Sequence, residues 1–598
     1  MASSNKQRKE SELSTYLDEL SDSDLFSESD SDSLSSVDIQ EYHDLYSDYD
    51  SDAEEPFTST GPSTSSGPST SSGPSTSSGP STSAGPSSPP DSDDELEDEV
   101  YLQVLPPEQS LPTPFTFLEQ SGPKNMPPPG SHPVEYFNLL FTVSLLTLMV
   151  TETNRYAKQV INGLGENVPK YLKKWKPVTI KEIKGFLAFI FAMGLDPKPK
   201  ISDYWSTLPP YNTPTWYGKM FSKHRFCHLL RFFHLVDSSK LPGPGELGYD
   251  ACARYQPLVD HANRVFRQHY TPHQEICVDE SLVGSKCHSK ILQYQLDKKH
   301  HKWGIKLWML CDSVSHYCLG FFTYKGAKSQ AEKHKISKFG LGYTVVRQLL
   351  KLGDYNDKGY HVFVDNYFTT APLIRGLYSH GTYCTGTVRK SRKQIPSRFK
   401  NKFAVGQTLY FRSGPILACG FRERKTRPKP VLLLSSHARA RDEKIVKRGV
   451  DKLMPQIVLS YNKFMGGVDV HDTMLHAYLD KRRNKKYWKK IAFNIIARMV
   501  LNAYLLYKEN SGSQANLMTH QRFYQEIIGS LEREWRGEET EAICPTDPRG
   551  PIGLRKLPEK SRYRCVVCST PNNKRRSTRV CTRCGKGVHA DCLVRHRC

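Results

Sequence analysis

Three stretches decide the fold of this chain: Glu275-Ile-Cys-Val-Asp-Glu280, His361-Val-Phe-Val-Asp-Asn366 and Met465-Gly-Gly-Val-Asp-Val-His-Asp472. In the first two, Asp279 and Asp365 follow short apolar runs of the kind that form strands. In the third, Asp469 lies beside a Gly-Gly turn that opens a predicted helix. An ionised carboxylate next to a buried strand is costly without a partner, and a bound metal ion supplies one. We therefore expect these three acids to converge.

Three converging carboxylates are a suitable ligand set for two Mg²⁺ ions, because Mg²⁺ is a hard ion that prefers oxygen and retains water ligands. Two such ions, about 3.5–4 Å apart, clamp the attacking and leaving oxygens of a phosphodiester. Asp472 lies three residues after Asp469, on the same helix face. It is either an auxiliary acid of this site or a charge that the helix N-terminus favours. Nucleotide hydrolysis is not expected, because the sequence has no Walker-type Gly-Lys loop.

Charge is divided unequally along the chain. Of 83 bases and 62 acids, the first 100 residues hold 3 and 24, which leaves 80 bases and 38 acids for the rest. A basic body attracts polyanions, so nucleic-acid binding is favoured over a basic protein with a solubilising tail. The N-terminal segment is rich in Ser, Asp and Glu, repeats Gly-Pro-Ser-Thr-Ser, and has few large apolar residues. It is predicted to be disordered.

The sequence has no signal-type apolar segment at its N-terminus, so secretion is not expected. The longest apolar stretch, residues 137–150, is too short for a membrane span and is predicted to be a buried helix. Nine of the 15 cysteines lie before residue 545 without framework spacing. They are typical of reduced core thiols in an intracellular protein.

From residue 274 the pattern changes from helical to strand-like. Strands are predicted over 275–278, 304–311, 317–324, 361–364 and 383–388, and helices over 338–352 and 369–378. This order gives a mixed α/β sheet. It resembles the RNase H-like fold, in which the first acid lies on strand one and the second lies beside it, at the end of strand four. The basic, strand-like residues that follow are interpreted as a β-rich insertion, and helical periodicity flanks the whole region.

The last 34 residues hold the other six cysteines, in the pattern Cys565-x2-Cys568, Cys581-x2-Cys584, His589-x2-Cys592 and His596-x-Cys598. Eight such ligands fit two tetrahedral zinc ions. The paired spacing favours a cross-brace, with one ion on Cys565, Cys568, His589 and Cys592 and the other on Cys581, Cys584, His596 and Cys598. A tail of about 35 residues buries little core, so metal binding is expected to drive its folding.

Two basic runs, residues 389–402 and 480–490, each contain seven bases. Such runs contact phosphates without reading sequence, or they form a solvated face. The predicted DNA contacts are Arg389, Lys390, Arg392, Lys393, Lys481, Arg482, Arg483, Lys485, Lys486, Lys574, Arg575 and Arg576. The last three, with residues 555–564, are either a nuclear-localisation signal or a DNA-contacting rim of the zinc module. Trp488 either stacks on an unpaired base or anchors its helix in the core.

At these residues the chain resembles the piggyBac-type DNA transposases, from about residue 134 to the C-terminus. The motifs are Val278-Asp-Glu-Ser281, Tyr294 to Lys306 with Trp-Gly-Ile-Lys, Val364-Asp-Asn-Tyr-Phe368, Cys384-Thr-Gly-Thr-Val-Arg389, Tyr461-Asn-Lys463, Gly466-Gly-Val-Asp-Val-His-Asp472 and the cysteine cluster. The resemblance implies a catalytic triad of Asp279, Asp365 and Asp469, with Asp472 as a further family acid. It implies cut-and-paste transposition through hairpin-ended intermediates, with insertion at TTAA targets.

The resemblance also implies a dimer, a dimerisation and DNA-binding domain split around the catalytic domain, Trp488 near the active site, and a zinc module that recognises transposon ends. We therefore expect an α/β protein with these segments: an acidic disordered tail (1–130), a helical domain in two parts (131–272 and 479–545), an RNase H-like catalytic domain in two parts (273–390 and 458–478), a β-rich insertion (391–457), a linker (546–560) and a cross-brace zinc domain (561–598).

The expected function is that of a nuclear DNA transposase with two catalytic Mg²⁺ and two structural Zn²⁺ ions. Its expected partners are double-stranded DNA and a second copy of the chain, and no membrane. Two other classes stay open: a domesticated transposase-derived DNA-binding or chromatin protein without mobility, and a zinc-dependent protein-interaction adaptor. Serines among acids, at residues 27–30 and 91–94, suit an acid-directed kinase or belong to a plain solvated tail.

Overall fold

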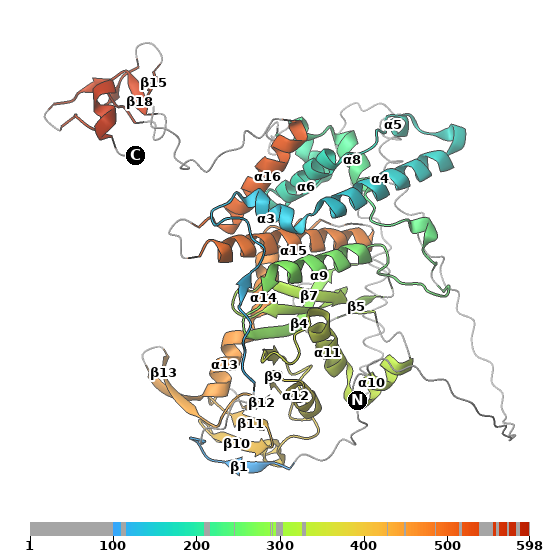
Figure 1. Ribbon diagram of the computed structural model, residues 1–598, viewed down its shortest axis with the longest axis vertical. Helices are drawn as coiled ribbons and strands as arrows, with labels where there is room; N and C mark the ends of the chain where they lie inside the picture. Colours follow the sequence, from blue (N-terminus) through green and yellow to red (C-terminus); the bar gives the residue numbers. More distant parts are fainter. Residues whose placement is uncertain are drawn as a thin grey trace. The chain divides into compact units, whose positions relative to one another are not determined.

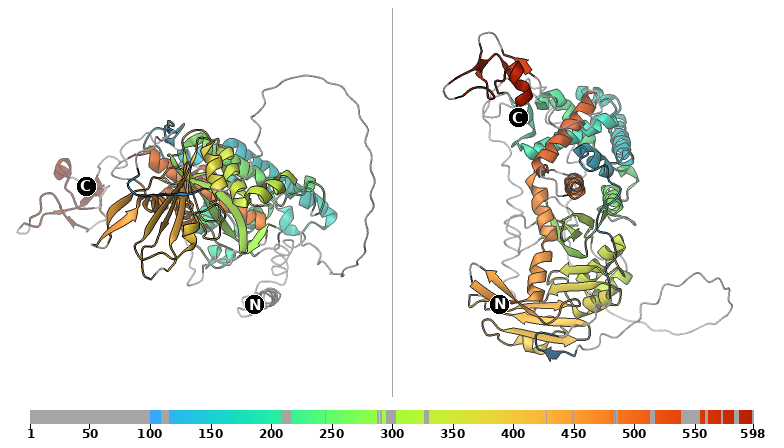
Figure 2. Two further views of the ribbon diagram at one scale, coloured as in Figure 1. Left: turned by 90° about the horizontal axis from the view of Figure 1, so that it is seen from below. Right: turned by 60° about the vertical axis from the view of Figure 1, so that its left-hand side comes forward.

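The computed structural model (Figures 1 and 2) describes residues 100–108, 115–207, 216–243, 245–286, 289, 291–294, 303–325, 330–426, 428–447, 450–482, 484, 486–512, 517–537, 554–557, 561–570, 573–581 and 586–596. The predicted disorder of residues 1–99 lies outside the described residues. So do most of the predicted linker, Arg483, Lys485, Cys584 and Cys598.

A mixed sheet of ten described strands forms the centre of the protein, in the order β1-β10-β11-β12-β9-β8-β4-β6-β5, with β7 paired to β6. Its core strands are β4 (Glu275–Gly284), β6 (Trp303–Asp312), β7 (Cys318–Thr323), β8 (His361–Val364) and β9 (Tyr383–Thr387), and β5 is Leu292–Tyr294. Strands β4, β6 and β7 pair antiparallel, whereas β4, β8 and β9 pair parallel. The predicted mixed α/β sheet and each of its predicted strands are confirmed.

Burial explains why the parallel strands are apolar throughout. All four residues of β8 are buried, as expected for a strand that is covered on both faces. Helices α11 (Leu341–Gly353) and α12 (Ala371–Tyr378) make the two crossovers, and α10 (Gln330–Phe339) precedes them. Helix α9 (Gln256–His269) packs on β7.

The predicted β-rich insertion continues this sheet and does not form a separate one. Strands β10 (Thr408–Ser413), β11 (Ile416–Phe421) and β12 (Val431–Ser435) follow β9, because β12 pairs with it antiparallel. This pairing covers an edge that β9 would otherwise expose. Strands β13 (Asp442–Lys447) and β14 (Val450–Pro455) form a hairpin of their own.

The boundary of the predicted tail at residue 130 is wrong. Strand β1 (Leu102–Val104) pairs with β10, and β2 (Gly122–Pro123) pairs with β3 (Tyr270–Thr271). Glu108 also forms a two-pronged ion pair with Arg412 at 2.5 and 2.6 Å. Backbone pairing to a sheet edge does not need an apolar core of its own, which is why composition alone placed this segment in the tail.

Helices from both ends of the described body pack together. These are α3 (Pro133–Leu140), α4 (Val143–Gly163), α5 (Lys170–Lys173), α6 (Ile180–Leu195), α7 (Trp216–Met220), α8 (Lys223–Phe232), α15 (Tyr487–Asn510) and α16 (His520–Arg536), with short 3₁₀ turns at Gly165–Asn167, Ile201–Trp205, Ser238–Lys240 and Ser397–Lys400. Helix α16 packs on α6, and α15 packs on α3. Gly185 permits the first contact, because a Cβ there would lie 2.7 Å from the Trp535 ring.

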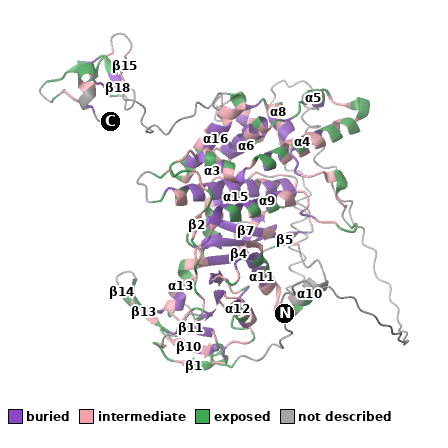
Figure 3. Cartoon of the chain, viewed as in Figure 1, coloured by how far each residue is buried: buried purple, intermediate pink, exposed green. Residues whose placement is uncertain are grey.

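Most residues of helix α15 are buried, and the helix is drawn largely in the colour of buried residues in Figure 3. The apolar stretch at 137–150, predicted as one buried helix, is broken: α3 ends at Leu140, with Phe141 as its C-cap, and Thr142 caps α4 by accepting a hydrogen bond from the Leu145 N–H. Among the described residues, no single helix is both long enough and apolar enough to cross a bilayer. Helices α3 and α4 meet the length and apolarity criteria only when taken together, and they are bent by 65° at the break between them.

The C-terminal residues form small elements, which are described here by themselves. Strand β15 (Leu554–Lys556) pairs with β18 (Arg579–Cys581), and β16 (Tyr563–Arg564) pairs with β17 (Arg576–Ser577). A 3₁₀ helix, η5, covers Ala590–Arg595.

Candidate active site

Parallel pairing brings the first two acids together. Val278 on β4 is opposite Val364, the last residue of β8; Asp279 is the next residue of β4, and Asp365 directly follows β8. Neighbouring strands lie roughly 4.8 Å apart, so these two acids lie side by side in the sheet. The predicted placement of the second acid beside the first is therefore confirmed.

Helix α14 (Gly467–Ala477) carries the third acid. It follows α13 (Gln456–Phe464) and packs on β4 and β6. Gly467 allows the contact, because a Cβ there would lie 2.5 Å from the Cys277 Sγ and 3.1 Å from the Asp312 carbonyl oxygen. Asp469 is in the first turn of α14, where the helix dipole favours a negative charge.

The charges of Asp365 and Asp469 act on Asp279. Burial and the charges of Asp469 and Asp365 raise the pKa of Asp279 to about 7, although the Glu280 N–H donates to its Oδ1 at 2.8 Å. Glu280 is turned away and pairs with Lys306 at 2.8 Å. The site thus holds more negative charge than its protein surroundings compensate.

Asp365 is held by Thr387, which in turn contacts Tyr461; the sequence assigned no role to either residue. Thr387, at the end of β9, donates its hydroxyl to Asp365 Oδ1 at 3.3 Å, and the Tyr461 hydroxyl lies 3.4 Å from the same threonine oxygen. Burial and the charges of the three acids raise the pKa of Tyr461 to about 12, so its hydroxyl stays protonated. Both residues lie in motifs quoted for the resemblance, and that was their only signal in the sequence.

Asp472 faces into the protein. Its Oδ1 accepts a hydrogen bond from the Ser281 hydroxyl at 3.0 Å and lies 3.0 Å from Nη1 of the buried Arg498. Burial opposes ionisation of Asp472, but the Arg498 charge outweighs it and holds the pKa of Asp472 below its usual value. Arg498 was missed, although it is a charged residue in the middle of an otherwise apolar helix.

A protein-family model described as Transposase IS4 matches residues 132–504. The chain belongs to this transposase family. The matched range includes Asp279, Asp365, Asp469 and Asp472, as well as Arg498, and it ends before the cysteine-rich C-terminus.

Its relatives are of the piggyBac type. Human piggyBac transposable element-derived protein 5 is 22% identical over 459 residues, covering 74% of this chain and 83% of the relative. Human piggyBac transposable element-derived protein 2 is 25% identical, covering 73% and 72%. A cryo-EM structure of a piggyBac transposase synaptic complex with hairpin DNA has a TM-score of 0.61 and 23% identity, covering 79% of this chain and 98% of that chain. This likeness shows that the transposase fold is shared.

In this transposase-family chain, the first basic run begins beside Asp365. The Arg389 Nε donates to the Asn366 Oδ1 at 2.7 Å, and the Arg392 Nη2 donates to the Tyr367 carbonyl at 2.7 Å. Arg389, Lys390 and Lys393 are exposed, so their charges face solvent close to the acids.

The second basic run is only partly exposed to solvent. Arg482 is half-buried and pairs with Asp480 at 2.8 Å, so its charge is already engaged, while Lys481 is exposed. Lys486 is the N-cap residue of α15. Trp488 is only 1% exposed and its ring lies 5.1 Å from that of His234. Of the two interpretations of Trp488, the structure therefore fits the helix anchor, because a buried ring has no free face for a base.

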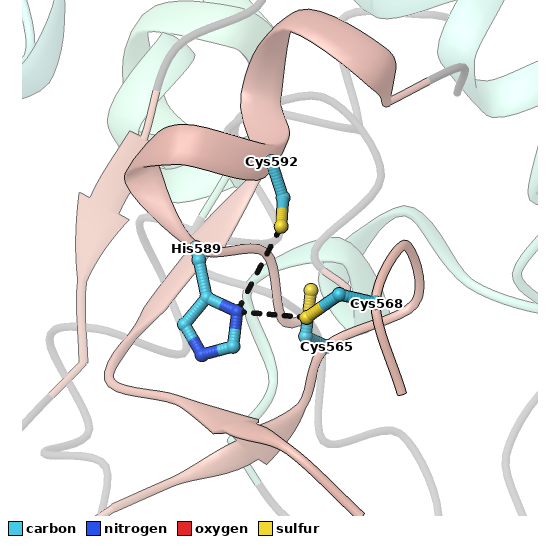
Figure 4. A group of neighbouring side chains, drawn as sticks. All are labelled: Cys565, Cys568, His589 and Cys592. Carbon is cyan, nitrogen blue, oxygen red and sulfur yellow. Dashed lines mark hydrogen bonds between the residues drawn. The ribbon is translucent and has the colours of Figure 1, made fainter. Parts of the chain in front are cut away.

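Four of the predicted metal ligands form a cluster of their own (Figure 4). The ligand atoms of Cys565, Cys568, His589 and Cys592 all lie within 4.8 Å of one another. The His589 Nδ1 lies 3.3 Å from the Cys568 Sγ, and its Nε2 lies 3.0 Å from the Arg576 carbonyl oxygen. That outer hydrogen bond leaves Nδ1 free to act as a ligand.

The Cys565 thiol favours its ionised form. Burial opposes this, but backbone N–H groups of Cys568, His589 and Val567 lower the pKa of Cys565 to about 6. Of the second predicted ligand set, Cys581 and His596 are buried, whereas Cys584 and Cys598 lie outside the described residues. Lys574, Arg575 and Arg576 are exposed.

Proposed function

We propose that this protein is a DNA transposase that hydrolyses DNA strands and transfers their 3′ ends, using Asp279, Asp365 and Asp469 on an RNase H-like sheet. The observation that carries the proposal is the placement of the three carboxylates: Asp279 and Asp365 follow paired residues of β4 and β8, and Asp469 is in the first turn of the helix that packs on β4. The strand order β7-β6-β4-β8-β9 supports the RNase H-like assignment. A fold by itself does not define a function, so the site has to support the activity.

The residues of the site fit a pair of Mg²⁺ ions. All three side chains offer oxygen, which hard cations prefer, and their mutual repulsion is the kind that a divalent cation relieves. When bound, such ions would polarise the scissile phosphate and favour ionisation of the attacking water or 3′-hydroxyl. Asp279, Asp365 and Asp469 would hold them.

The remaining residues would orient these acids and the DNA. Thr387 and the Asn366 N–H fix the Asp365 carboxylate through hydrogen bonds. Arg389, held by Asn366, would contact a backbone phosphate next to the acids, and Lys390, Arg392 and Lys393 would extend that contact along the strand. These contacts carry no sequence preference of their own.

Recognition of the element ends is assigned to the cysteine-rich module. The Cys565, Cys568, His589 and Cys592 cluster has the ligand types and number of a structural zinc site, and a second zinc on Cys581, Cys584, His596 and Cys598 completes the proposed cross-brace. Exposed Lys574, Arg575 and Arg576 favour DNA over a protein partner.

The family relationship carries the finer proposals. Hairpin-ended intermediates, TTAA targets, a homodimer on double-stranded DNA and a nuclear location are proposed for this chain, and its piggyBac-type relatives make them reasonable to test. Helices α3 to α8, α15 and α16 are the proposed dimerisation and DNA-binding domain. Serines of the acidic tail are proposed substrates of an acid-directed kinase.

The test compares purified wild-type protein with Asp365→Asn on DNA duplexes that carry candidate element ends next to TTAA. We expect Mg²⁺ to give nicked and hairpin-sized products on a denaturing gel, Ca²⁺ to give none, and Asp365→Asn to bind the duplexes but cleave at least a thousandfold more slowly. Asp354→Asn is the matched control, because Asp354 is exposed at the left-handed C-cap of α11, a conformation that Asn tolerates. Binding without cleavage by the wild type would instead indicate a transposase-derived DNA-binding protein.

A further inference from the structure

A buried three-residue network joins the two elements that carry Asp279 and Asp469. The Arg498 Nη2 donates to the Ser281 hydroxyl at 2.6 Å, and the Ser281 hydroxyl donates to Asp472 Oδ1 at 3.0 Å. The Arg498 Nη1 closes the triangle at 3.0 Å from the same carboxylate oxygen. Arg498 and Ser281 are 1% and 2% exposed and the Asp472 side chain is 19% exposed, so most of the network lies inside the protein.

The three residues come from three separate elements. Ser281 is on β4, two residues after Asp279 and therefore on the same face of the strand. Asp472 is on α14, three residues after Asp469. Arg498 is on α15, in the helical part of the chain. The guanidinium therefore connects the helical part to both elements at the positions that bear catalytic acids.

Arg498 belongs to a row of buried polar residues along α15. Asn494, Arg498 and Asn502 are four residues apart and so lie on one face of the helix. The Asn502 Oδ1 accepts from the Cys318 N–H at 3.1 Å, and its Nδ2 donates to the Cys318 carbonyl at 2.9 Å. Asn502 thus attaches α15 to β7, whereas Arg498 attaches it to β4 and α14.

Stability alone does not account for this network. Desolvating a buried ion pair costs about as much as the attraction returns, so well-packed apolar residues of similar size usually serve the fold equally well. The Arg498 Nε also has no hydrogen-bond partner among the described residues, and Nη1 meets Asp472 as an ion pair without hydrogen-bond geometry, so the charge is incompletely satisfied. What apolar residues cannot supply is a directional contact that sets the position of α14 on β4.

We propose that Arg498 is a positioning residue, which fixes α14 against β4 so that Asp469 meets Asp279, and that Asp472 serves as its acceptor and not as a metal ligand. The inference rests on the proposed function. If the inference is right, the helical part after residue 479 is needed for Asp279 and Asp469 to bind metal, although neither acid belongs to that part.

The experiment measures Mn²⁺ binding by electron paramagnetic resonance and, on the same variants, thermal unfolding. Only those Mn²⁺ ions whose binding is lost in Asp365→Asn are counted. We expect Arg498→Met to weaken Mn²⁺ binding at least tenfold and to lower the unfolding midpoint. The triple variant Arg498→Met/Ser281→Ala/Asp472→Leu leaves no buried polar group unpaired, so we expect its midpoint to recover while its Mn²⁺ affinity stays low. Asn502→Ala is the matched control, because it loosens α15 from β7 only; its midpoint should fall, with Mn²⁺ affinity within twofold of wild type.

Two outcomes would overturn the proposal. Wild-type Mn²⁺ affinity in the triple variant would show that the network only stabilises the fold. Loss of one bound Mn²⁺ in Asp472→Asn, with unchanged binding in Arg498→Met, would make Asp472 a ligand.

If wild-type protein binds no Mn²⁺ at the acids, the proposed function fails. Hydrogen exchange in residues 468–477 then tests the positioning role of Arg498 separately. Faster exchange in Arg498→Met than in Asn502→Ala supports it, and equal exchange rejects it.

Discussion

Two buried carboxylates beside the site have opposite electrostatics, and the contrast separates their roles. Burial and two neighbouring acids raise the pKa of Asp279, whereas Arg498 outweighs burial and lowers the pKa of Asp472. The negative charge of Asp279 is therefore not compensated by the protein, whereas that of Asp472 is compensated by Arg498. At the residue scale, this difference favours Asp279 as a metal ligand and Asp472 as a structural acceptor.

A second pair of residues makes stability depend on pH. The fully buried Asp312 accepts hydrogen bonds from the His273 N–H at 2.6 Å and lies 3.0 Å from its Nδ1. The hydrogen bond to Asp312 raises the pKa of His273 above 6.5. Burial opposes ionisation of Asp312, but the contacts with His273 and the Ser315 N–H hold its pKa below 3.8.

We therefore expect the pair to stabilise the fold most between about pH 4 and 6.5. The contribution of His273 is complete below 6.5 and is lost as pH rises through its raised pKa; that of Asp312 is complete above 3.8 and is lost as pH falls through its lowered pKa. Thermal unfolding from pH 3 to 9 measures this. His273→Gln should be about 1 kcal/mol less stable near pH 6 and lose the alkaline slope. An unchanged slope in that variant would assign it to other groups.

At the scale of elements, the approach of α14 to β4 decides the site. Besides the close contact of Gly467, the His471 ring is buried, with its Nδ1 3.0 Å from the His316 carbonyl oxygen. The start of the helix is thus held against β4 and against the turn between β6 and β7. A helix set back by even one ångström would take Asp469 away from the other acids.

Adjacent glycines give a matched test of this contact. Gly467→Ala would place a Cβ 2.5 Å from the Cys277 Sγ, so we expect α14 to shift, stability to fall by about 1–3 kcal/mol, and cleavage to be lost. Gly466→Ala is the control, because nothing lies within 4 Å of its Cβ and its φ is −76°. It should keep activity and stability or gain up to about 1 kcal/mol. Equal effects of the two changes would argue against close packing as the cause.

At the scale of the whole molecule, the sheet-centred body and the cysteine-rich module rely on different forces. The body has a large apolar core that spans the sheet and the helices. The module buries few apolar side chains around its Cys-His cluster. We expect metal binding to supply most of the folding free energy of the module.

Metal removal tests that difference. A zinc chelator should make residues 554–596 sensitive to protease while leaving the main thermal transition of the body within about 1 °C, since domains with separate cores unfold independently. Cys568→Ser should reproduce the effect without chelator, and Cys227→Ser, outside the cluster, should not. A module that resists protease after complete metal removal would contradict this account.

The exposed bases of the module should act through phosphates. Replacing Lys574, Arg575 and Arg576 by Gln should reduce the slope of log K against log[salt] by about 2–3, because each phosphate contact releases counterions. Binding titrations from 50 to 200 mM salt on element-end and random duplexes measure it. Equal losses on both duplexes are expected, and a loss confined to element ends would show that these side chains read sequence.

The sequence by itself determined the order of the core strands and the places of Asp279, Asp365 and Asp469. These follow from local rules: apolar runs end at an acid, and a Gly-Gly turn opens a helix. It also determined the Cys565, Cys568, His589 and Cys592 group, because ligand spacing in a small module is short-range. The boundary errors were confined to segments, such as residues 102–104, whose structure depends on a distant partner strand.

Only the tertiary structure decided how these acids are held and compensated. Thr387 reaches Asp365, Tyr461 reaches Thr387, and Arg498 reaches Asp472 and Ser281, across separations of up to 217 residues. It also decided that Trp488 is buried and that the insertion extends the central sheet. Such contacts depend on which elements pack together, and packing is a property of the whole chain that no local spacing encodes.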